Sequence, residues 1–98
     1  MTGWEFSEGV IAKARRYLDA EKIQRDATAG GVFWVKGSAE RLYRVHTDAD
    51  PERGTATWID CSCAHGLNNG GKARCSHAVA VLLATRDRLE IPLGGPEA

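Results

Sequence analysis

The sequence predicts an α+β fold, in which an N-terminal helix, a small antiparallel sheet of three to four strands and a C-terminal helix form one domain. Apolar residues recur at helical spacing near the start of the chain. β-type runs separated by turn residues fill its middle, and a second helical run follows a short segment rich in cysteine and histidine. At 98 residues the chain is long enough for one small domain, residues 1–98, and too short for two.

The first helix is expected from about Ser7 to Lys22 because apolar side chains recur three and four positions apart. Ser7 is a suitable N-cap, and Glu8 follows where the helix dipole favours an acid. The basic face, with Lys13, Arg15 and Arg16, is interpreted as solvated, with phosphate contacts as the alternative. The face expected to be buried carries Val10, Ile11, Ala14, Tyr17 and Leu18.

The pattern in the middle of the chain predicts a meander of three or four antiparallel strands. The strand signal is strongest in Val32–Lys36, Arg41–Thr47 and Thr55–Asp60. Strand alternation places the side chains of the first two on opposite faces of the sheet. One face is expected to carry Phe33, Val35, Tyr43 and Val45, and the other Trp34, Leu42 and Arg44.

The three tryptophans, Trp4, Trp34 and Trp58, have two interpretations. They could stack on nucleic-acid bases, as in proteins that bind single strands. Aromatic side chains dominate small cores, so a core position is the favoured interpretation.

The C-terminal helix is apolar on most sides and ends in the charged turn Arg86-Asp87-Arg88. A helix of this kind must be largely buried, and we expect it to lie across the sheet. Its apolar residues are Ala78, Val79, Val81, Leu82, Leu83 and Ala84.

All three cysteines and two of the three histidines lie between Ile59 and His77. Cys61 and Cys63 extend a strand, so alternation points both sulfurs to one side. Cys75 and His77 stand where the second helix begins, and its first turn can present both inward. The eleven residues between the two pairs include three glycines and two asparagines, which suit the tight turns of a chain reversal.

Four ligands of the Cys3His type match a closed tetrahedral zinc site. Thiolate-rich ligand sets favour zinc over magnesium or calcium, and a site without a vacant position is structural rather than catalytic. The chain shows no signal peptide and no apolar run long enough for a membrane span, so we expect a cytoplasmic protein with reduced cysteines. Zinc binding is expected to contribute on the order of 10 kcal/mol to folding.

The spacing C-x-C, eleven residues, C-x-H, with strands reading FWVKGSAERLYRV and TATWIDCSC before it and an AVAVLLA helix after it, resembles a SWIM-type zinc finger. The resemblance covers about Val32 to Ala84. It implies a zinc-bound module that binds DNA or proteins, with Cys61, Cys63, Cys75 and His77 as ligands. His65 is a further potential ligand, but the family pattern favours His77. We therefore expect His65 to be an exposed loop residue, with a bond to a ligand or a partner as the alternative.

The function expected from these features is binding rather than catalysis, because no deaminase signature, phosphate loop or nucleophile with an adjacent base is present. No small-molecule substrate and no membrane is expected. Thirteen basic residues balance thirteen acidic ones, so nucleic acid would have to bind a local patch. The residues proposed for that patch are Lys72, Arg74, Arg41 and Arg44.

Nucleic acid, DNA or RNA with DNA slightly favoured, is placed slightly ahead of a protein partner because of the family. The alternative is a protein-interaction adaptor, such as a phage-encoded factor that binds a host protein. Nine arginines against four lysines, with fourteen alanines, are typical of a GC-rich genome, either actinobacterial or that of a phage of such a host.

Overall fold

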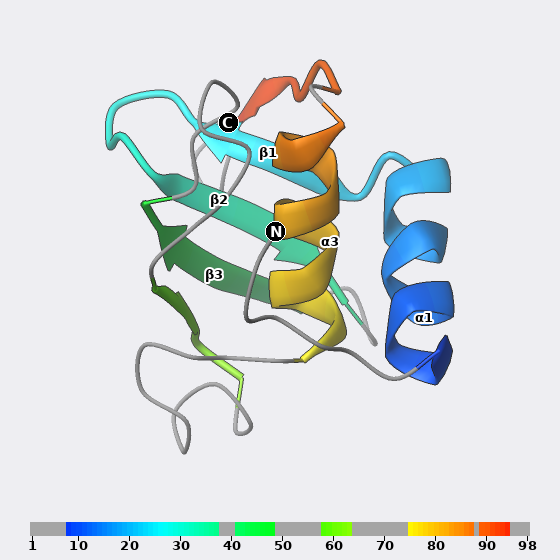
Figure 1. The fold of residues 1–98 in the computed structure, drawn as a ribbon. Helices are drawn as coiled ribbons and strands as arrows, with labels where there is room; N and C mark the ends of the chain where they lie inside the picture. Colours follow the sequence, from blue (N-terminus) through cyan, green and yellow to red (C-terminus); the bar gives the residue numbers. More distant parts are fainter. Residues whose placement is uncertain (1–7, 38–40, 49–57, 64–74, 88, 95–98) are drawn as a thin grey trace.

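The computed structural model describes residues 8–37, 41–48, 58–63, 75–87 and 89–94. In these ranges two helices, α1 and α3, accompany one five-stranded sheet (Figure 1). Helix α3 lies across the sheet and α1 lies beside α3 (Figure 1). The predicted α+β class is therefore confirmed. None of the described helices is both long and apolar enough to span a bilayer.

Helix α1, Glu8–Asp19, buries the face that the sequence predicts. Ala14 and Tyr17 are buried, and Val10, Ile11 and Leu18 pack against the core. The helix ends three residues before the predicted Lys22. The amide of Lys22 bonds to the carbonyl of Tyr17, the amide of Glu21 bonds to that of Leu18, and Glu21 has a φ of 53°. This left-handed residue and the two crossing bonds form a Schellman motif, which stops the helix.

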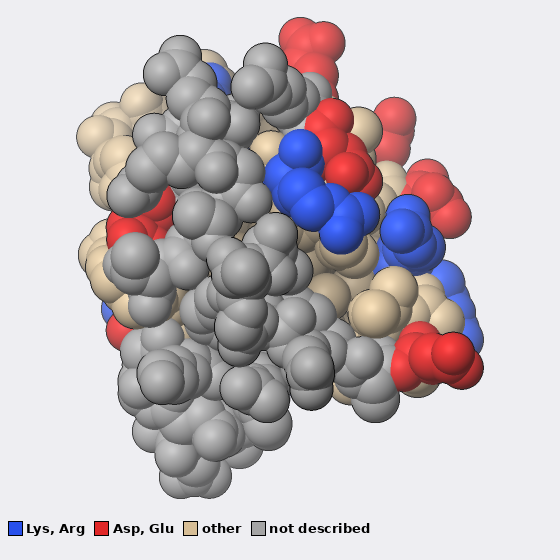
Figure 2. Space-filling model, viewed as in Figure 1, with Lys and Arg blue, Asp and Glu red and all other residues tan. Residues whose placement is uncertain are grey.

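The basic residues of α1 are exposed, which agrees with a solvated face. In the view of Figure 2, blue and red side chains are interspersed over the region of α1. A mixture of charges favours contact with water over the binding of a polyanion.

The sheet has the strand order β4-β3-β2-β1-β5. Strands β1 (Ile23–Asp26), β2 (Val32–Lys36), β3 (Leu42–Thr47) and β4 (Ile59–Cys61) form an antiparallel meander. The two-residue strand β5, Leu93–Gly94, adds a parallel edge to β1, so the sheet is mixed rather than purely antiparallel. β2 has the predicted bounds, β3 begins one residue later than predicted, and most of the predicted Thr55–Asp60 strand lies outside the described residues.

The core lies between the sheet and the helices. Phe33 pairs with Val45 and Val35 with Tyr43, so these four share the inner face, as predicted. Helix α3, Ser76–Arg86, packs over this face and is buried without interruption from Ala78 to Thr85. A helix that is apolar on nearly every side is stable only when other elements enclose it.

Trp34 and Trp58 are half-buried and do not belong to the core cluster, so the favoured core interpretation is wrong for these two residues. Trp34 pairs with Arg44 on the outer face of the sheet, opposite the core. Trp58 precedes β4 and meets His46 edge-on, with ring centroids 4.8 Å apart. Trp4 lies outside the described residues.

Gly31 makes the turn into β2 possible. Its φ is +77°, and a Cβ there would lie 2.6 Å from the carbonyl oxygen of Thr47. The Gly31 carbonyl also accepts a hydrogen bond from the Thr47 amide. A side chain at this position would therefore meet both backbone strain and a backbone atom that cannot move freely.

We expect Gly31→Ala to lower the free energy of unfolding by roughly 2 to 3 kcal/mol, since it adds left-handed strain and a steric clash. Gly30→Ala is the matched control, because a Cβ there meets no atom within 4 Å. Urea unfolding of both variants checks the prediction. Equal stability of the two variants would show that the turn does not require glycine.

Asp26 organises the turn between β1 and β2. Its Oδ1 accepts hydrogen bonds from the amides of Thr28 and Ala29 and from the Thr28 hydroxyl, and its Oδ2 accepts one from the indole of Trp34 at 2.9 Å. These bonds, with that of Trp34 the strongest cause, lower the pKa of the Asp26 carboxyl below its usual range. The carboxylate thus holds the turn and the orientation of Trp34 together.

Asp26→Asn should lower the melting temperature, because an amide nitrogen cannot accept the bond from Trp34. Combining it with Trp34→Phe forms a double-mutant cycle that isolates this contact. Thermal unfolding followed by circular dichroism should give a double variant less destabilised than the sum of the single variants. Strictly additive effects would mean that the bond contributes nothing.

Candidate metal centre

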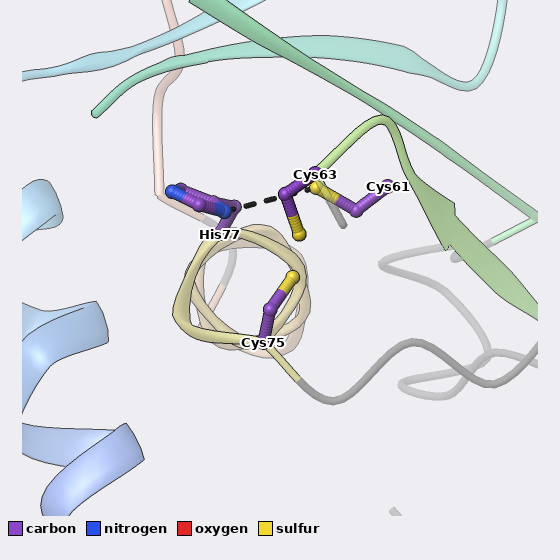
Figure 3. A group of neighbouring side chains, drawn as sticks. All are labelled: Cys61, Cys63, Cys75 and His77. Carbon is purple, nitrogen blue, oxygen red and sulfur yellow. Dashed lines mark hydrogen bonds between the residues drawn. The ribbon is translucent and has the colours of Figure 1, made fainter. Parts of the chain in front are cut away.

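Cys61 and Cys63 stand at the end of β4. Cys61 is the last residue of the strand and pairs with Val45 on the inner face. The pairing continues through Ser62, whose amide bonds to the Arg44 carbonyl and whose hydroxyl accepts from the Arg44 amide, both at 2.9 Å. Cys63 therefore continues the strand's alternation of side chains between the two faces of the sheet. Both sulfurs lie on the side facing α3, as predicted (Figure 3).

Cys75 and His77 come from the start of α3. Cys75 is the N-cap, with extended backbone angles, and its carbonyl accepts the bond from the Val79 amide that opens the helix. His77 lies in the first turn. Figure 3 shows the two pairs converging, with the sulfurs of Cys63 and Cys75 pointing toward each other.

The four side chains form a cluster with the dimensions of a metal site. One ligand atom from each of Cys61, Cys63, Cys75 and His77 lies within 4.8 Å of all the others, and the Cys61 Sγ is 3.8 Å from the His77 Nδ1. A tetrahedral zinc ion with bonds of about 2.3 Å to sulfur and about 2.0 Å to nitrogen separates its ligands by roughly 3.5 to 3.8 Å. The donor set and its spacing therefore fit such an ion with little movement.

The cluster is shielded unevenly from solvent. Cys61 is only 3% exposed, whereas Cys63, Cys75 and His77 are half-buried. Cys61 thus belongs to the hydrophobic core, and Cys63 and Cys75 pack against that core. Such a site joins the end of the sheet to the helix rather than opening onto a cleft.

The cysteines of the cluster influence one another through hydrogen bonds. A hydrogen bond with Cys61, aided by His77 and by the Ala78 amide, lowers the pKa of Cys75 to about 4. The same contact with Cys75, together with burial, raises the pKa of Cys61. Cysteines bind a metal ion as thiolates, so binding through all three sulfurs releases their remaining protons.

The His77 ring contacts two tyrosines. Tyr43 of β3 stacks on it with ring centroids 4.2 Å apart, and Tyr17 of α1 lies at 5.5 Å, both inclined by 28°. A Cβ on the buried Gly37 would lie 3.1 Å from the His77 Nε2 and 2.7 Å from Tyr43 Cε2. The spacing of the ligands in the sequence does not indicate that these three residues lie beside the metal site.

The four side chains could hold a metal ion, and their cluster is consistent with a zinc finger. No protein-family model, curated protein or solved structure matches the chain. The resemblance to the SWIM type accordingly rests on the ligand spacing and the neighbouring elements.

The residues predicted for nucleic acid divide between described and undescribed parts of the chain. Arg41 and Arg44 are exposed, and Arg44 lies on the outer face of the sheet beside Trp34. Lys72 and Arg74 lie outside the described residues, as does His65. His46 is exposed and touches Trp58.

Proposed function

We propose that the protein is a non-enzymatic binding module of SWIM type, in which Cys61, Cys63, Cys75 and His77 hold one structural zinc ion. The convergence of four ligand atoms from the end of β4 and the start of α3 is the observation that carries the proposal. Three thiolates and one imidazole suit zinc better than the hard cations, which prefer oxygen.

A structural role for the zinc follows from its ligand number and position. Four protein ligands complete a tetrahedron and leave no position for water or substrate. The ion would cross-link β4 to α3, two elements that meet in the core. The binding free energy, on the order of 10 kcal/mol for sites of this kind, would stabilise the fold.

Cobalt substitution tests the ligand set. Metal-free protein titrated with Co2+ should develop intense visible bands of a tetrahedral ion and sulfur-to-cobalt charge-transfer bands in the near ultraviolet, both lost on addition of zinc. His65→Ala should give the same spectrum and serves as the control. The weak spectrum of octahedral cobalt would contradict a closed Cys3His site.

For the partner, we propose nucleic acid, with DNA ahead of RNA. The exposed Arg44, which lies across from the half-buried Trp34 on the outer sheet face, supports this proposal. Arginine contacts phosphates, and an indole can stack on a base. The net charge is zero, and three thiolates with Zn2+ change it by minus three plus two, to minus one. Binding would thus depend on a local surface and weaken with salt.

Fluorescence anisotropy with labelled double-stranded and single-stranded DNA and RNA tests this partner. Binding should be saturable and fall with salt, and Arg44→Glu should weaken it several-fold without changing zinc content. Lys72→Glu with Arg74→Glu tests the predicted loop, and Arg16→Glu on α1 is the charge-matched control. Absence of binding at low salt would eliminate nucleic acid and leave the protein adaptor, to be sought by affinity capture.

A further inference from the structure

The metal centre contains one ligand whose donor atom is ambiguous. Each cysteine offers only its sulfur, whereas His77 can bind through Nδ1 or Nε2. In the structure Nδ1 faces the thiols, 3.8 Å from the Cys61 Sγ. Nε2 lies on the side of Gly37, where an added Cβ would be 3.1 Å away. The ring orientation thus selects the donor atom.

Two side chains from separate elements hold that orientation. Tyr43 stacks on the imidazole at a centroid distance of 4.2 Å, and Tyr17 lies at 5.5 Å. Tyr17 is buried and Tyr43 packs against the core, so neither ring is free to follow a moving imidazole. We call Tyr17 and Tyr43 the tyrosine pair.

The backbone of Gly37 gives Tyr43 its room. With a Cβ, residue 37 would come within 2.7 Å of Tyr43 Cε2, so the Tyr43 ring could not keep its place beside His77. The Gly37 amide bonds to the Arg41 carbonyl at 2.8 Å, which fixes the backbone at this point. Gly37 and the tyrosine pair together leave the imidazole one well-packed orientation.

We propose that the tyrosine pair positions His77 so that Nδ1 is its metal-binding atom, and that helix α1 is thereby part of the metal centre. The inference rests on the proposed metal site. Helix α1 lies outside the residues that resemble the SWIM type and holds no ligand in its described residues, yet it supplies Tyr17. Groups that orient a metal-binding histidine commonly change metal affinity about tenfold or more when removed.

The test identifies the donor nitrogen directly. In 15N-labelled protein loaded with 113Cd as a spectroscopic substitute for zinc, long-range 1H–15N spectra distinguish a metal-bound Nδ1 from a metal-bound Nε2. The wild type and Tyr43→Phe, which keeps the ring, should both bind through Nδ1. Tyr43→Leu should show a changed or mixed donor, together with roughly tenfold weaker zinc binding. Tyr17→Leu should weaken zinc binding less, because its ring is farther away.

A control separates positioning from general stability. Leu83, buried in the last turn of α3, is remote from the ligands along the helix, so Leu83→Ala should lower the melting temperature while the donor remains Nδ1. Wild-type binding through Nε2, or an unchanged donor and affinity in both leucine variants, would overturn the inference. If Tyr43→Leu fails to fold, the inference is still tested by two measurements: the donor nitrogen in the wild type and the zinc affinity of Tyr17→Leu. A wild type that binds neither zinc nor cadmium would instead refute the proposed function.

Discussion

Removal of the metal should unfold the protein. A zinc contribution on the order of 10 kcal/mol is comparable to the entire stability of a small domain, about 5 to 15 kcal/mol. The core here is one sheet face covered by α3, with α1 packed beside α3, and the buried Cys61 belongs to it. Without the ion, the four side chains of the cluster would no longer join β4 to α3.

The experiment is a titration with a strong chelator, followed by far-ultraviolet circular dichroism and 1H–15N correlation spectra. We expect helical signal and dispersed amide resonances to be lost together and to return when zinc is added back. Magnesium is the control, since it prefers oxygen ligands and should not restore the fold. Dispersed resonances that persist in verified metal-free protein would show that the core alone maintains the structure.

Replacement of a ligand should have an effect nearly as large. Cys63→Ser and His77→Ala each remove one of the four donors, so zinc binding should weaken by more than the roughly hundredfold upper range known for residues that only orient ligands. Both variants should be largely unfolded at micromolar zinc. Competition with a chromogenic chelator measures the affinity, and circular dichroism measures the fold.

His65→Ala is the matched control for His77→Ala, because it removes the same side chain two residues after a cysteine. It should retain both zinc and fold. Loss of zinc in His65→Ala combined with retention in His77→Ala would reverse the histidine assignment and refute the geometry described above.

Elements with strong periodicity were predictable from sequence. The apolar face of α1 and the bounds of β2 follow from spacing alone, as does the alternation that places Phe33 and Trp34 on opposite faces. Strand β5 was not predictable, because two residues are too few to show a periodic pattern and because they pair with Arg25 and Asp26 in a distant part of the chain. Helix α1 ends earlier than predicted because Glu21 adopts a left-handed conformation, which is unfavourable for a residue with a side chain such as glutamate.

The cluster that could hold a metal ion was predictable for a similar local reason. C-x-C at a strand end and C-x-H at a helix start each present two side chains together. The residues around this cluster were not predictable from the sequence, because Tyr17 and Tyr43 come close to His77 only when the helices and the sheet pack together. The tryptophans illustrate the same limit: aromatic content suggested a core, whereas strand register places Trp34 on the outer face.

The most direct test of the account is native mass spectrometry of the purified full chain, with the metal identified by elemental analysis. We predict one zinc ion per chain, lost in Cys63→Ser and retained in His65→Ala. A folded wild-type chain that carries no metal, and takes up none when zinc is supplied, would contradict the central claim that this cluster is a structural zinc site.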